Sequence, residues 1–247
     1  MDLFQKNFKI KIIIFFVVCI FCIQPSYSQE NTAQLSLADS LFKKNELIES
    51  EKIYLAILAS KSSFEENILY KLAFIAKRKN NYLDELKYLN SINLRNSTPE
   101  ISQRLEEIGK KRGLPEYEID FLERLKWIYF QYFYLILFTL FIPLIYSIFV
   151  LLNKAKKREK IQNSSIVLAL GYTLFLTIIL NLPYLFQFGI ITQDKSYLRD
   201  FDSSGAPVLL NLKKGSKVMI IQENKVWNLC LKDQKLGYVL KNHLEKI

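Results

Sequence analysis

Glycine, cysteine and histidine are scarce in this chain of 247 residues, and their scarcity excludes several kinds of site. With 7 glycines, a glycine-rich phosphate-binding loop is not expected, and none is visible. Cys19 and Cys22 lie in an apolar N-terminal segment, so Cys230 alone remains if that segment is removed, and no intramolecular disulfide framework is possible. Because His243 is the only histidine, a zinc site or a Cys/His or Ser/His nucleophile has very weak support. We therefore expect no enzyme, metal ion or cofactor.

Charge is missing from two long runs, residues 127–152 and 161–193. Each exceeds the roughly 20 apolar residues that cross a bilayer as a helix. The alternative, core helices of a soluble protein, is disfavoured because buried helices rarely run this long without a charge. Neither run contains Asp, Glu, Lys, Arg or His, which argues against transport. Trp127, Tyr129, Tyr132 and Tyr134 gather at the start of the first run, as in an interfacial aromatic belt.

Between the runs, residues 153–163 hold five cations and one anion. By the positive-inside rule, a short basic loop between two spans is cytoplasmic. We therefore predict a membrane-proximal segment and first transmembrane helix over 117–152, a cytoplasmic loop over 153–163, and a second transmembrane helix over 164–191.

The net charge of +10 does not indicate nucleic-acid binding, because residues 29–126 carry sixteen basic and sixteen acidic side chains. At the N-terminus, three lysines precede an apolar run over 12–23 and then small residues, which predicts a signal peptide over 1–28. Both segments that flank the hairpin are then exported to the same side of the membrane.

Residues 29–116 show helical spacing of apolar residues and repeat at an offset of 35. Ala38 corresponds to Ala73 where helices cross, and Asn45 to Asn80 in the turns. The offset and these residues resemble the tetratricopeptide repeat. Ser50 and Glu85 depart from it, because that family usually has a small alanine there; generic helical hairpins remain possible. Thr98 and Pro99 start one more helix, which we expect to cap the repeats and to end at Gly113.

The resemblance implies a concave groove for a peptide or a partner helix. The groove-facing residues carried over from the family are Asp39, Phe42, Lys43, Asn67, Tyr70, Phe74, Lys77 and Arg78. Four of them, Lys43, Asn67, Lys77 and Arg78, could together hold the C-terminal carboxylate of a peptide by charge-assisted hydrogen bonds. A solvated basic face is the simpler explanation of the same residues.

Residues 194–247 change to short alternating runs with turn signals, which predict about five strands over 196–199, 207–212, 217–221, 226–231 and 235–239. So short an all-β segment predicts a small barrel. Its Lys214-Gly215 turn, Trp227 strand and Gly237-Tyr238-Val239 closure resemble the bacterial SH3 (SH3b) family. That family binds peptides or cell-wall peptides. Trp227 and Tyr238 are candidates for stacking on a ligand, although core packing is the favoured explanation, because aromatic residues at strand spacing usually lie in the core.

The order of the modules predicts a multidomain membrane protein: all-α tetratricopeptide-like repeats, a two-helix transmembrane hairpin and a small all-β SH3-like barrel. This order resembles the BatE-like family of aerotolerance (Bat) operons. The resemblance implies a non-enzymatic inner-membrane protein with both soluble domains in the periplasm. It implies as partners Bat components with von Willebrand A domains and a MoxR-type ATPase system.

Two functional hypotheses remain open. In the first, the protein is a scaffold or adaptor that holds periplasmic or inner-membrane proteins in an envelope-stress or aerotolerance complex. In the second, it is a cell-wall sensor or anchor that binds peptidoglycan peptides through the SH3b barrel. The sequence names neither the ligand nor the oligomeric state.

Overall fold

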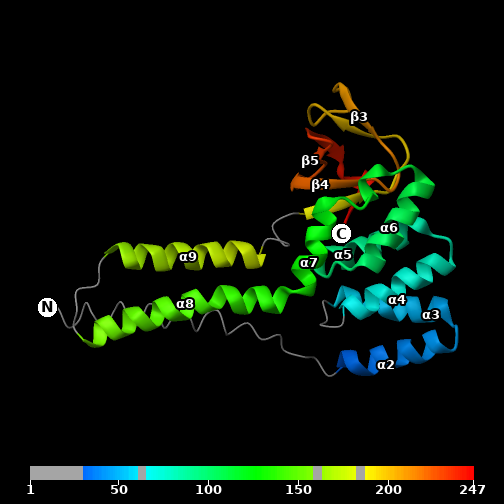
Figure 1. Ribbon diagram of the computed structural model, residues 1–247. Helices are drawn as coiled ribbons and strands as arrows, with labels where there is room; N and C mark the ends of the chain where they lie inside the picture. The colour runs from blue at the N-terminus through cyan, green and yellow to red at the C-terminus, as the bar shows by residue number, and fades with distance from the viewer. Residues whose placement is uncertain (1–29, 61–64, 158–162, 182–186) are drawn as a thin grey trace. The chain divides into compact units, whose positions relative to one another are not determined.

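The computed structural model describes residues 30–60, 65–157, 163–181 and 187–247 (Figure 1). The predicted signal peptide, 1–28, lies outside the described residues. The chain divides into two compact units, residues 1–68 and 69–247, and each is described by itself.

Two helical hairpins repeat as the sequence predicts. The first consists of α2 (Glu30–Lys43) and α3 (Leu47–Ala59), the second of α4 (Glu65–Arg78) and α5 (Tyr82–Arg95). Asn45 and Asn80 both adopt left-handed φ angles, of 64° and 56°. The amide that follows each one donates five residues back, Glu46 N to Leu41 O at 2.9 Å and Asn81 N to Ala76 O at 2.9 Å. The 35-residue repeat of the sequence is therefore a repeat of turn geometry, because asparagine tolerates the left-handed region.

Helix α6 (Pro99–Arg112) confirms the helix predicted after the two hairpins; that it caps the repeats stays a prediction. The Thr98 hydroxyl accepts from Ile101 N at 3.4 Å, Pro99 occupies the first turn, and Gly113 ends the helix at φ 67°. The chain then folds back through the short 3₁₀ helix η1 (Pro115–Tyr117). This reversal depends on Gly109, where an added Cβ would lie 2.8 Å from the Tyr117 Cβ.

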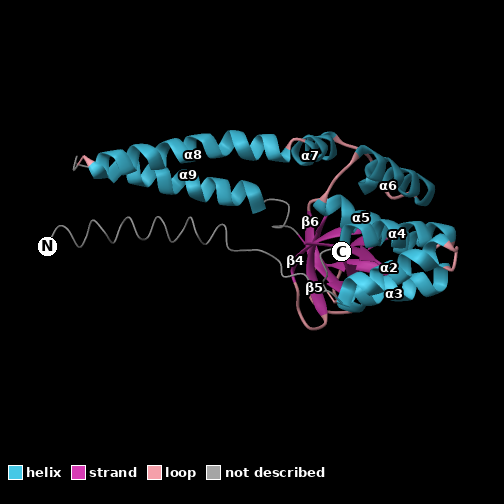
Figure 2. Ribbon diagram, turned by 90° about the horizontal axis from the view of Figure 1, so that it is seen from below, coloured by secondary structure: helices cyan, strands magenta, loops and turns pink. Residues whose placement is uncertain are grey.

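Three helices follow: α7 (Phe121–Gln131), α8 (Phe133–Lys156) and α9 (Asn163–Asn181). Helices α8 and α9 lie side by side in both views (Figures 1 and 2), and the Tyr172 hydroxyl donates to Leu140 O at 2.6 Å. Among the described residues, Phe133–Lys154 is the one helix long and apolar enough to cross a membrane; the apolar stretch of α9, Val167–Asn181, is shorter.

The described strands form one antiparallel sheet of seven strands, in the order β3-β2-β6-β5-β4-β1-β7. Their bounds are β1 (Gln187–Ile191), β2 (Ser196–Arg199), β3 (Val208–Leu212), β4 (Lys217–Gln222), β5 (Trp227–Lys232), β6 (Lys235–Leu240) and β7 (Leu244–Lys246). The 3₁₀ helix η3 (Lys241–His243) precedes β7. The core of the sheet contains Ile191, Leu198, Val218, Cys230 and Val239.

Two predictions about this region were wrong. The second apolar run does not stay helical to 191, because α9 ends at Asn181 and Gln187–Ile191 is strand β1. This strand lacks charge because it lies between β4 and β7, with Ile190 and Ile191 buried in the protein. The five predicted strands are present as β2 to β6, but the sheet is open: among the described strands, β3 and β7 form its two edges and do not pair.

Candidate functional site

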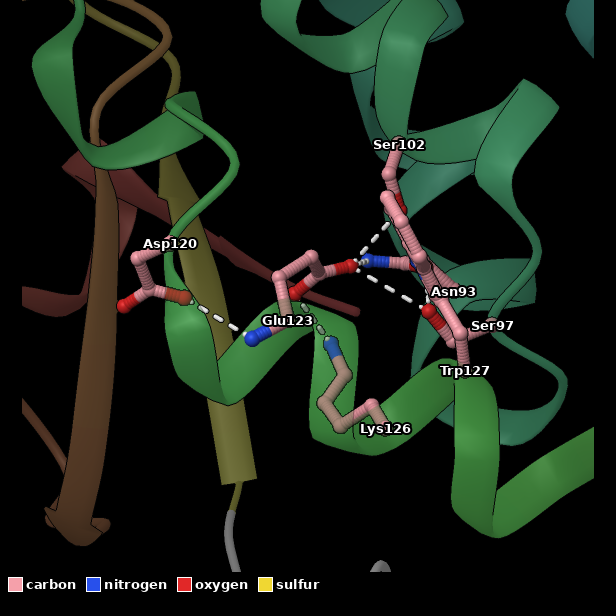
Figure 3. Close-up of polar contacts among 7 residues, drawn as sticks. All are labelled: Asn93, Ser97, Ser102, Asp120, Glu123, Lys126 and Trp127. Atoms are coloured by element: carbon pink, nitrogen blue, oxygen red, sulfur yellow. Dashed lines mark hydrogen bonds and ion pairs between the residues drawn. The ribbon is translucent and has the colours of Figure 1, made fainter.

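A buried polar cluster holds the start of α7 against α5 and α6 (Figure 3). The Asp120 carboxylate caps α7 by accepting from Glu123 N at 2.8 Å, which places Glu123 in the first turn. From there Glu123 Oε1 accepts from Asn93 Nδ2 and from the Ser102 hydroxyl, each at 2.7 Å. Its Oε2 accepts from Lys126 Nζ at 2.7 Å. One carboxylate thus connects three helices.

The neighbours of Glu123 complete the network. Ser97 Oγ lies 2.6 Å from Asn93 Oδ1 and 3.2 Å from Glu123 Oε1. Trp127 Nε1 donates to Ser102 Oγ at 3.0 Å. Asn93, Ser97 and Ser102 are each at most 3% exposed, so these bonds are shielded from water. Trp127 is half-buried through this contact, and its place in a membrane-interface belt stays a prediction.

The electrostatics of this cluster favour an ionised carboxylate. Burial by itself would raise the pKa of Glu123. The Lys126 ammonium and the hydrogen bonds from Lys126, Asn93 and Ser102 outweigh burial and lower the pKa to about 2. Glu123 therefore acts as a charged acceptor that fixes α7, rather than as an acid that exchanges protons near neutral pH.

A second set of contacts joins the same helices to the sheet through η1. The buried Tyr117 hydroxyl donates to Gly215 O at 2.9 Å. Glu116 Oε1 accepts from Lys217 N at 3.0 Å and lies 3.1 Å from Lys232 Nζ. Gly215 has φ 92°, and an added Cβ would lie 3.0 Å from Leu114 Cδ1. The Lys-Gly turn, predicted as an SH3b signature, is thus where the sheet meets the helices.

A small cavity of about 20 Å³ lies between the two sets of contacts, lined by Asn90, Glu116, Glu123 and Lys217 among others. Burial, and then the nearby Lys126 ammonium, lowers the pKa of Lys217 to about 8, although the carboxylates of Glu123 and Glu116 act in the opposite direction. Asn90 Oδ1 is buried without a hydrogen-bond partner among the described residues. The cavity has polar walls and space for about one water molecule.

A larger pocket of about 360 Å³ opens between the α4–α5 turn and α6. Its charged lining consists of Lys77, Glu85, Arg104, Lys111 and Arg112. Glu85, buried at the departure from the repeat pattern, is neutralised by Arg104, whose Nε lies 2.7 Å from its carboxylate. The remaining cations face an open space that suits an anionic group.

The predicted groove residues fall into two sets. Asn67, Tyr70, Phe74, Lys77 and Arg78 are all exposed, at helical spacing on α4. In the 1–68 unit, Lys43 is exposed, whereas Asp39 accepts from the Tyr54 hydroxyl at 2.7 Å and the Phe42 ring packs edge-on against Tyr54. Because most of α4 belongs to the other unit, a groove that joins both sets stays a prediction.

The two candidate ligand-binding aromatics of the sheet differ in exposure. Trp227 is 9% exposed, so its ring is covered by the protein. Tyr238 is half-buried opposite Leu229 and Arg199. His243 Nδ1 lies 3.0 Å from Ser196 Oγ, and that hydroxyl is also within donating distance of Gln193 O at 2.9 Å. Among the described residues there is no group of three or more His, Cys, Asp or Glu side chains that could hold a metal ion.

Comparison with known proteins does not assign the chain to a family. No protein-family model matches the sequence, and no curated protein matches it. The tetratricopeptide, SH3b and BatE-like resemblances therefore stay predictions.

Proposed function

We propose that the protein is a non-enzymatic membrane scaffold that presents a helical module and an SH3-like sheet domain on one side of the bilayer. The observation that carries this proposal is the double attachment of α5 and α6. Glu123 fastens them to the helix that leads into α8, and Tyr117 fastens them to the Gly215 turn of the sheet. A scaffold needs its binding surfaces held in a fixed relation, and buried, mutually satisfied polar contacts provide that.

The proposed membrane anchor is a hairpin of α8 and α9. Helix α8 has 24 residues, about 36 Å, and α9 has 19, about 28 Å, against a hydrocarbon core of about 30 Å. Apolar side chains such as Leu135, Phe138, Leu168 and Leu174 are exposed around both helices, as lipid contact requires. The basic loop then lies in the cytoplasm, and the helical module and the sheet in the periplasm.

The proposed partner is a protein with an acidic segment that docks on the helical module. The pocket beside α6 supports this, because the exposed side chains of Lys77, Lys111 and Arg112 line it. The BatE-like resemblance would place such a partner in an aerotolerance or envelope-stress complex. The cell-wall alternative has less support, because the covered Trp227 ring cannot stack on a ligand.

Affinity purification of the tagged full-length protein in mild detergent tests the proposal. The variant Lys77→Glu/Lys111→Glu reverses the charge of the pocket. The control Lys52→Glu/Lys225→Glu changes the net charge equally at exposed sites elsewhere. We expect mass spectrometry to find companions that are lost from the first variant and kept by the control. Companions retained by both variants, or cell-wall fragments alone, would contradict the proposal.

Deleting the helical module would be a poor test. Helices α5 and α6 hold both α7 and the Gly215 turn, so their removal would also release the sheet and the membrane-proximal helix. Charge reversal at exposed sites leaves these contacts in place.

A further inference from the structure

Helix α7 has an exposed apolar side that its contacts with α5 and α6 do not use. Phe121, Leu122, Leu125 and Ile128 are 72%, 66%, 44% and 52% exposed. At about 100° per residue they occupy an arc of about 120°, and Glu123 and Trp127 lie outside it. We call these four residues the apolar stripe. A surface helix normally buries such a stripe in the protein core, whereas here it points away from the protein.

Chain continuity identifies what covers the stripe. Helix α7 ends at Gln131, Ile136 N donates to Tyr132 O at 2.9 Å, and α8 begins at Phe133. The C-terminal end of α7 must therefore lie at the surface of any bilayer that α8 crosses. Since its 11 residues span about 16 Å, the whole stripe stays close to that surface.

The direction of α7 is also consistent with a position at the bilayer surface. Figure 1 shows α7 turned steeply away from the axis of α8. In Figure 1, α5 and α6 lie on one side of α7, and α8 and α9 extend on the other. Glu123 and Trp127 bind on the α5–α6 side, and at about 100° per residue the stripe lies on the opposite side of α7.

Charge beside the stripe fits a lipid surface as well. Arg124 is exposed at the border of the arc and has no ion pair among the described residues. A long cationic side chain at such a border can lie along the apolar surface and reach the lipid phosphates.

We propose that α7 lies in the plane of the bilayer surface, with the apolar stripe inserted between headgroups and acyl chains. The bilayer is thus a binding partner of α7, and it fixes how α5, α6 and the sheet are oriented above it. This inference rests on the proposed crossing of the membrane by α8.

Spin labelling of the full-length protein in vesicles of phosphatidylethanolamine and phosphatidylglycerol tests the inference. Single cysteines replace Leu122 and Leu125 in the stripe, Gln103 on the exposed face of α6, and Phe138 on α8, in a background with Cys19→Ser and Cys22→Ser. The buried Cys230 is kept, because burial raises the pKa of its thiol to about 12 and makes it unreactive. Each nitroxide is measured for collision with oxygen, which enriches in lipid, and with a water-soluble nickel complex.

We expect labels at 122 and 125 to collide more with oxygen than with nickel, at a depth shallower than the label at 138, while the label at 103 favours nickel. If 122 and 125 match 103 while 138 remains in lipid, the inference is wrong and the crossing of α8 stands. If 122 and 125 are shielded from both reagents, a second copy or another protein covers the stripe, which also overturns the inference. If 138 favours nickel, the crossing itself fails.

Discussion

Glu123 shows how one side chain can decide the position of a helix. It is an ordinary acidic residue in sequence, yet two neutral donors and one ammonium converge on it. Replacing it by glutamine keeps its size and removes the charge. The amide oxygen of glutamine can keep the bonds from Asn93 and Ser102, but its Nε2 then faces Lys126 Nζ, so the ammonium loses both its acceptor and its counter-charge.

We therefore expect Glu123→Gln to lower the free energy of unfolding by about 2–3 kcal/mol at neutral pH. Thermal unfolding of the full-length protein in detergent measures the loss. Asp202→Asn, which removes the same charge at an exposed loop, should change stability by less than about 0.5 kcal/mol. Equal stability of both variants would show that the cluster does not hold α7.

The low pKa of Glu123 also predicts an acid-sensitive contact. Its folded pKa of about 2 lies below the ordinary value of 4.5, so its contribution is complete above about pH 4.5 and is lost as the pH falls towards 2. At about 1.4 kcal/mol per unit, that contribution is about 3 kcal/mol. Unfolding measured from pH 7 to pH 3 should show a slope that Glu123→Gln reduces; an unchanged slope would exclude Glu123 as its source.

Lys217 should make the stability of the protein depend on pH in the alkaline range, as Glu123 does in the acidic range. Burial, followed by repulsion from Lys126, lowers its pKa from 10.5 to about 8, so between these values the unfolded chain binds more protons than the folded one. Stability should therefore rise as the pH increases from about 8 to 10.5. Lys217→Met should flatten this rise in the same unfolding assay, whereas the exposed control Lys225→Met should leave it in place.

Among the elements, the turn between β3 and β4 carries the contact of the sheet with the helices. Gly215 combines φ 92° with Leu114 Cδ1 at 3.0 Å from an added Cβ, so Gly215→Ala both strains the turn and pushes it off the helices. We expect a loss of about 1–2 kcal/mol in unfolding free energy and faster hydrogen exchange at β4. Gly205→Ala is the matched control, because its nearest neighbour, Ser203 Oγ, is 3.9 Å away. Similar effects of both variants would refute the role of Gly215.

Elements with a local signal were predictable from the sequence. Asn45 and Asn80 mark the two turns because left-handed φ favours asparagine, and Thr98 and Gly113 mark the ends of α6. Strand β1 was not predictable from lack of charge, since burial in a sheet and burial in lipid both exclude charge. Gly189 is a glycine inside this apolar run, and the structure shows why it is there: an added Cβ would lie 2.8 Å from the Leu244 side chain of the neighbouring strand.

The Glu123 cluster could not be predicted, because tertiary packing brings Asn93, Ser102 and Glu123 together from three separate helices. The sequence of α5 contains a weak sign of a buried polar cluster. Asn90 and Asn93 share the helical spacing of Leu86 and Leu89, so amides occupy positions that an apolar face would otherwise fill. Buried polar residues at apolar positions must find partners, but the sequence does not say which.

At the scale of the whole molecule, the hairpin proposal predicts which residues each side of the membrane can reach. In the Cys19→Ser/Cys22→Ser background, the cysteine of Lys157→Cys, in the basic loop, should react with a membrane-impermeant maleimide only after cells are permeabilised. A cysteine at Gln103 should react in spheroplasts that are still sealed. Reaction of both positions in sealed spheroplasts would exclude the cytoplasmic loop, and reaction of neither would exclude an external helical module.

The position of β1 in the sheet has a consequence for synthesis. It is the first strand to leave the ribosome but an inner strand of the sheet, with Gly189 opposite Val218 on one side and Lys246 on the other. At roughly 5–20 residues per second, β7 follows β1 by several seconds. During that interval β4 can cover one edge of β1, but the edge that β7 will cover keeps its backbone groups unpaired. The sheet is therefore complete only after translation has passed β7, and until then one edge of β1 is a defined segment for a chaperone to protect.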